Sequence, residues 1–163
     1  MDKQLRKRVS LLNPDHFLGL GFGSGLVPLM PGTFGSLAAI PLILAMSVLS
    51  IEWFIAMTIL ATIMGVRFCQ KTSDALKLHD HGSIVWDEIA GMMVVFIAVP
   101  ITFTSLVLGF VLFRFFDILK PWPIRVFDQK VHGGIGIMLD DIVAGAMACL
   151  CLHLIMHFAW LSF

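Results

Sequence analysis

A run of uncharged residues spans positions 89–113 and reads IAGMMVVFIAVPITFTSLVLGFVLF, with Pro100 near its centre. Proline lacks a backbone N–H and disfavours helical geometry in the residue before it, here Val99. The run is therefore either one kinked helix or a hairpin of two helices. This choice decides the fold, because it determines on which side of a membrane the rest of the chain lies.

The composition indicates a membrane protein. The chain has 163 residues, of which 58% are hydrophobic and 13% charged, whereas a soluble domain is usually about 25% charged. Further uncharged stretches cover residues 17–51, 53–66 and 142–163. A transmembrane helix needs about 20 apolar residues, so the last stretch is long enough to span and the stretch at 53–66 is short. No linker or repeat divides the chain, and we expect a single domain over residues 1–163.

The distribution of basic residues favours the hairpin, because cytoplasmic loops carry an excess of Lys and Arg. If the N-terminus is inside and the chain turns near Pro100, residues 1–16, 67–88 and 114–141 are all cytoplasmic. These segments hold all 11 Lys and Arg residues. A single kinked helix would place the Lys and Arg residues after residue 113 outside the cell membrane, and the cytoplasmic excess of basic residues would be lost. The sequence therefore predicts an all-α fold, a compact membrane-embedded helical bundle with about five apolar helices and a cytoplasmic polar face.

The net charge and the cysteine spacing restrict which ligands and cross-links we expect. The net charge is zero and no basic stripe with interleaved aromatic residues is present, so we expect no nucleic acid. The cysteines Cys69, Cys149 and Cys151 fit neither a metal-ligand spacing nor a disulfide framework. The sequence leaves the oligomeric state open.

Two pairs of adjacent carboxylates stand at the starts of predicted apolar helices. Asp87 and Glu88 follow Ser83, which we expect to be the N-cap, and Asp140 and Asp141 precede the last apolar stretch. Acids at membrane depth are costly unless cations hold them, and they usually serve a function. Two such pairs meeting in one bundle would repel each other unless divalent cations lie between them, and carboxylate oxygens suit Mg²⁺. We therefore predict that all four acids are catalytic and bind Mg²⁺.

A mixed-charge segment follows the central apolar run. Asp117 lies three residues after Arg114 and three before Lys120, so the three share a face if the helix continues. We predict Asp117 as a further Mg²⁺ ligand, with an ion pair to a neighbouring base as the alternative for both Asp117 and Asp128. Basic residues beside a membrane commonly bind anionic lipid headgroups. The residues predicted to bind substrate in this region are Lys120, Arg125, Lys130 and His132.

Residues 31–36, PGTFGS, open the first long apolar helix. Glycines let backbone amides approach an anion, and a helix N-terminus favours phosphate, so Thr33 and Ser36 join the predicted substrate-binding residues. The segment is not a Walker loop, because the lysine and the full spacing are missing. Carboxylates for Mg²⁺, cations and an anion-binding helix start together fit phosphoryl chemistry on a lipid headgroup.

Three long strings carry a close resemblance to the phosphatidylglycerophosphatase A family. They read GFGSGLVPLMPGTFGSLAAIP at 21–41, HDHGSIVWDEIAGM at 79–92 and FRFFDILKPWPIRVFDQKVHGGIGIMLDDIVAG at 113–145. The resemblance implies an all-helical, Mg²⁺-dependent enzyme of phospholipid biosynthesis. Such an enzyme removes the terminal phosphate of phosphatidylglycerophosphate, its lipid substrate, to give phosphatidylglycerol. We expect the chain in the cell inner membrane, with the active site facing the cytoplasm, where the excess of Lys and Arg places the polar segments.

The sequence is less consistent with other functions and mechanisms. A small cation or proton transporter would use the paired acids as an ion path, but transporters place such acids near mid-membrane rather than at one edge. A lipid-binding scaffold would need the bases but not both acidic pairs. A covalent cysteine nucleophile is not expected, because none of the three cysteines begins a Cys-x₅-Arg motif. Direct attack by metal-activated water is the favoured mechanism.

Overall fold

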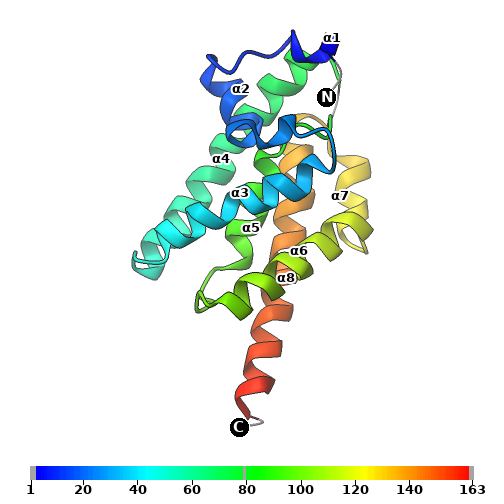
Figure 1. Ribbon diagram of the computed structural model, residues 1–163. Coiled ribbons are helices and arrows are strands. Elements are labelled where there is room, and N and C mark those ends of the chain that lie inside the picture. The colour runs from blue at the N-terminus through cyan, green and yellow to red at the C-terminus, as the bar shows by residue number, and fades with distance from the viewer. Residues whose placement is uncertain (1–2, 79, 162–163) are drawn as a thin grey trace.

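The computed structural model describes residues 3–78 and 80–161, and every regular element in these ranges is helical (Figure 1). Residues 162–163, the end of the last predicted apolar stretch, lie outside them. The elements are α1 (Lys3–Arg6), α2 (Pro14–Gly19), the 3₁₀ helix η1 (Gly21–Leu26), α3 (Pro31–Met46), α4 (Ile51–Leu76), α5 (Trp86–Val95), α6 (Phe103–Leu119), α7 (Ile124–Lys130) and α8 (Gly133–Leu161).

The chain does turn near Pro100. Helix α5 ends at Val95, Ala98 adopts a left-handed conformation with φ +58°, and α6 begins at Phe103. Thr102 caps α6 through a capping box with Ser105, in which each side chain bonds to the backbone N–H of the other residue. The predicted hairpin of two helices is therefore confirmed.

The prediction of about five apolar helices in a membrane-embedded bundle is not confirmed. Within the described ranges, the helices long and apolar enough to cross a membrane are Ile51–Leu76 and Gly133–Phe158. Helix α3 has 16 residues and α5 has 10. At 1.5 Å per residue α5 is about 15 Å long, roughly half the hydrocarbon thickness of a bilayer. Helix α5 instead packs inside the bundle, whereas α3 keeps exposed apolar side chains such as Phe34 and Leu44.

Helix α5 is the centre of the bundle and contacts α3, α4, α6 and α8 (Figure 1). Its residues are buried along most of its length, including Ile89, Ala90 and Met92. Gly91 allows α8 to approach closely, because a Cβ atom there would lie only 2.8 Å from the backbone oxygen of Asp141. The second acidic pair is thereby brought against α5.

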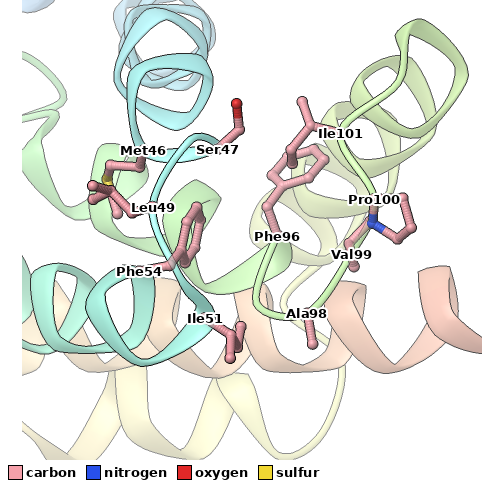
Figure 2. Close-up of a pocket in the computed structure, with 10 residues that line it drawn as sticks. All are labelled: Met46, Ser47, Leu49, Ile51, Phe54, Phe96, Ala98, Val99, Pro100 and Ile101. Atoms are coloured by element: carbon pink, nitrogen blue, oxygen red, sulfur yellow. The ribbon is translucent and has the colours of Figure 1, made fainter.

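The two turns α3–α4 and α5–α6 meet at the end of the bundle opposite the first turn of α5. Figure 2 shows Phe54 and Phe96 beside a cavity of about 310 Å³ between these turns. Ser47 is the one hydroxyl side chain among the residues that line it, and none of them is charged. The acidic and basic side chains that carry chemistry gather at the other end.

Candidate active site

The first turn of α5 supplies one acidic pair. Asp87 is 6% exposed and Glu88 is partly buried, and both follow directly on Trp86, the first residue of the helix. Acids in a first helical turn interact favourably with the helix dipole. The predicted N-cap, Ser83, is wrong: Val85 occupies that position, and its side chain has no hydrogen-bonding group to cap the helix.

The second pair lies inside α8 rather than at its start. The helix begins at Gly133, so Asp140 and Asp141 are in its third turn. The N–H of Gly134 donates to Oε1 of Gln70 at 2.6 Å and fixes the helix start on α4. Adjacent residues on a helix point about 100° apart, and the two acids accordingly have different neighbours.

Asp141 joins the α5 pair. The carboxylate oxygens of Asp87, Glu88 and Asp141 lie within 4.8 Å of one another, and we call these three residues the carboxylate cluster. Asp141 is 3% exposed. Three carboxylates this close and this buried need a cation to be ionised together.

Asp140 turns instead toward Lys120. The Nζ atom of Lys120 donates to Oδ2 of Asp140 at 2.6 Å and to Oδ1 of Asp128 at 2.5 Å. Burial lowers the pKa of Lys120, but the bonds to the two carboxylates outweigh it, so the pKa lies above its ordinary value. One ammonium group thus links α6, α7 and α8.

The C-terminal end of α6 borders the carboxylate cluster. Nη1 of Arg114 donates to Oδ2 of Asp117 at 2.5 Å, and both side chains are mostly buried. Asp117 also interacts electrostatically with Glu88 and Asp141. Asp117 therefore forms the alternative ion pair, with Arg114, and lies beside the cluster, while its role as a Mg²⁺ ligand stays a prediction. Asp128 forms an ion pair with Lys120.

The start of α3 lies against the same acids. A Cβ atom on Gly32 would collide with Oε1 of Glu88 and lie 3.1 Å from Nη1 of Arg114. Ser36 is buried; its Oγ donates to the carbonyl oxygen of Gly32 at 2.9 Å and lies 3.5 Å from Nη1 of Arg114. The glycine predicted to admit an anion thus lies where the buried acids and the arginine meet.

Several buried polar atoms at this site have no hydrogen-bond partner among the described residues. They are Oδ1 of Asp87, Oε2 of Glu88, Oδ1 of Asp140 and Nε of Arg114. Burial raises the pKa of Glu88 to about 7. Buried carboxylate oxygens and a guanidinium N–H are rarely left unpaired, so these atoms are available for a cation and an anion respectively.

Arg114 is the functional candidate that the sequence analysis missed. It was assigned only an ion-pair role, although its spacing of three from Asp117 and its place at the end of an apolar helix marked it. Of the predicted substrate-binding residues, Ser36 and Lys120 lie at the site and Thr33 is half-buried at the start of α3. Arg125, Lys130 and His132 are exposed residues of α7 and the segment after it.

Comparison with known proteins identifies the family of the chain. The family model described as Phosphatidylglycerophosphatase A matches residues 17–156. Phosphatidylglycerophosphatase A of Escherichia coli K12 is 48% identical over 93% of this chain and 89% of its own length. The protein of the same name from Haemophilus influenzae is 47% identical over 93% of this chain and 94% of its own length. No solved structure matches. The chain therefore belongs to the phosphatidylglycerophosphatase A family and is a phosphatase.

Proposed function

We propose that this protein hydrolyses phosphatidylglycerophosphate to phosphatidylglycerol and phosphate, as a Mg²⁺-dependent enzyme of phospholipid biosynthesis. The carboxylate cluster carries the proposal, because it brings Asp87, Glu88 and Asp141 within 4.8 Å of one another beside Arg114. The family relationship supports the substrate.

The residues present fit a hard divalent cation. The cluster offers only carboxylate oxygens, two of which, on Asp87 and Glu88, are buried without a hydrogen-bond partner. Oxygen-only sites favour Mg²⁺ over softer metals. Asp87, Glu88 and Asp141 would hold the ion, and Asp117 stands next to them as a further ligand or as the anchor of Arg114. When bound, Mg²⁺ would neutralise charge on the phosphate oxygens and acidify water.

The protein groups around the cluster suit the phosphate itself. Arg114 has an unpartnered Nε, and a guanidinium group matches the geometry of phosphate oxygens. Helix α3 starts at Pro31, and Gly32 lies against Glu88 and Arg114, so the partial positive charge of the helix start lies beside the same groups. These groups would orient the phosphomonoester while an oxygen of water bonds to phosphorus and the bond from phosphorus to the glycerol oxygen breaks.

The proposed lipid substrate and the two long apolar helices support a membrane position. We propose that α4 and α8 cross the inner membrane and that the carboxylate cluster lies at the cytoplasmic headgroup level. The acids gather at one end of the bundle beside the bases, rather than along an ion path through it. This arrangement supports the phosphatase over the transporter alternative.

Phosphate release from the purified protein tests the function. We expect hydrolysis of phosphatidylglycerophosphate, loss of activity with EDTA and recovery with Mg²⁺. Asp87→Asn and Asp141→Asn should each lower kcat by about 10³, because a group that stabilises transition-state charge and the ion it holds are both affected. Glu52→Gln, an exposed acid at the far end of the bundle, is the control. Full turnover in metal-free buffer, or no release from any lipid phosphate, would refute the proposal.

A further inference from the structure

An apolar groove runs between α3 and α6. It is lined by Leu37 and Ile40 of α3 and by Phe103, Leu106, Val107 and Phe110 of α6, and it has a volume of about 290 Å³. We call it the α3–α6 groove. Several of these side chains are strongly exposed: Phe103 is 83% exposed and Val107 46%. Such a groove needs an apolar occupant to be covered.

One end of the groove is the candidate active site. Leu37 follows Ser36 directly, and Phe110 lies one helical turn before Arg114 on the same face of α6. Nη1 of Arg114 and Oγ of Ser36 approach to 3.5 Å, so polar groups of the two helices meet next to the lining residues at that end. From Phe110 the apolar face of α6 continues to Phe103, about 10 Å away at 1.5 Å per residue.

We propose that the α3–α6 groove binds an acyl chain of the lipid substrate. This inference rests on the proposed function and adds the element that recognises the lipid portion. A phospholipid with a terminal phosphate is anionic at one end and apolar over the rest. The arginine at the end of the groove and the apolar walls beyond it match that order of groups.

A second apolar groove, between α3 and α4, is larger, but it does not approach Arg114. It has a volume of about 410 Å³, and its lining includes Leu60, Met64, Phe68 and Met93. Neither groove is lined by a charged residue, but the α3–α4 groove approaches the first turn of α5 at Trp86, whereas the α3–α6 groove approaches Arg114. Near the first turn of α5 the α3–α4 groove meets the rings of Trp86 and Phe22, which stack edge to face at 5.7 Å. It therefore provides the control surface for the experiment.

The test compares Val107→Trp, which fills the α3–α6 groove, with Leu60→Trp, which fills the α3–α4 groove. Each variant is assayed on phosphatidylglycerophosphate with long acyl chains and on the dihexanoyl form with the same headgroup. We expect Val107→Trp to raise KM for the long-chain lipid by about tenfold or more. A factor of this size corresponds to losing the burial of about two methylene groups of the acyl chain. The dihexanoyl form should change less than twofold, and Leu60→Trp should change neither. Loss of kcat/KM to the same extent for both chain lengths, or the same effect from Leu60→Trp, would overturn the proposal.

Photo-crosslinking tests the groove independently of turnover. The probe is a phosphatidic acid with a diazirine in one acyl chain, bound to the full-length protein in detergent. Label is expected on α3 and α6 at the groove, and is expected to be lost in Val107→Trp but retained in Leu60→Trp. Label confined to α4, or spread evenly over the apolar helices, would overturn the proposal even if the lipid is hydrolysed. If no lipid phosphate is hydrolysed but the groove is labelled, the proposed function fails and the binding site stands.

Discussion

Gly32 lies directly against the carboxylate of Glu88, so that a methyl group at position 32 would collide with Oε1. The start of α3 and the first turn of α5 are thus fitted to each other at the carboxylate cluster. Because Glu88 is one of the three cluster residues, the absence of a side chain at Gly32 permits the arrangement of the acids.

Gly32→Ala should therefore displace Glu88 and lower kcat by about 10²-fold, since small misplacements of catalytic groups have effects of this size. The measurement is phosphate release at saturating lipid and Mg²⁺. The matched control is Gly82→Ala, where a Cβ atom would meet only Cγ of Pro31 at 4.0 Å. Equal activity in the two variants would show that the position of Glu88 does not matter.

Arg114→Lys should separate the effect of the positive charge at position 114 from the effect of the planar guanidinium group. The lysine keeps a positive charge beside Asp117, but it cannot present the planar set of donors that a guanidinium offers to phosphate. We expect a higher KM and a lower kcat with little change in Tm. Arg67→Lys is the control, because Arg67 forms an exposed ion pair with Asp15 at 3.1 Å. It should leave KM, kcat and Tm unchanged. Wild-type kinetics for Arg114→Lys would exclude a phosphate-binding role for the guanidinium group.

Lys120→Met should destabilise the protein more than Lys130→Met does. Lys120 joins Asp128 and Asp140, and removing it leaves the nearly buried Asp140 unpaired, at a cost of about 1–3 kcal/mol. For a chain of this size we expect Tm to fall by about 2–4 °C for each kcal/mol. Lys130 is exposed and has no recorded ion pair among the described residues. Equal Tm values for the two variants would contradict this account.

The pH dependence of that stabilisation has a definite sign. Because the pKa of Lys120 is raised on folding, its contribution is complete below the unfolded value of about 10.4 and is lost as the pH rises above it. The difference in Tm between wild type and Lys120→Met should accordingly shrink in strong alkali. A difference that vanishes near pH 7 would mean that another group is responsible.

Cysteine labelling tests the membrane orientation. Ser50 and Thr102 lie in the turns at one end of the bundle and Gln129 lies in α7 at the other end. In a variant without the three native cysteines, Ser50→Cys and Thr102→Cys should react with an impermeant thiol reagent from the periplasmic side. Gln129→Cys should react only after the membrane is permeabilised. Labelling of Gln129→Cys in intact cells would invert the proposed topology.

The acidic pairs and the turn at Pro100 could be predicted because each is indicated by a short local sequence pattern. Paired acids beside apolar runs are rare, and proline limits the residue before it whatever surrounds it. The sequence also indicated that α5 and α8 meet through their acids, and Asp141 does lie with Asp87 and Glu88.

The separate environments of Asp140 and Asp141 depend on where α8 begins, and this could not be seen in the sequence. The stretch Gly133–Gly134 is typical of a loop, but its closeness to α4 and the bond to Gln70 make it the first turn of a helix. The position of Arg114 was likewise hidden, since its approach to Ser36 joins residues 78 positions apart. Tertiary packing determines both the start of α8 and the position of Arg114.

Direct titration of the purified protein with Mg²⁺ tests the central claim, that Asp87, Glu88 and Asp141 form one cation site. Isothermal calorimetry of the wild type should show saturable binding, and Asp141→Asn should weaken it by at least about tenfold. Asp74→Asn changes an exposed acid that accepts a hydrogen bond from Gln70, and it should bind as the wild type does. Unchanged affinity in Asp141→Asn, or no saturable binding by the wild type, would contradict the account.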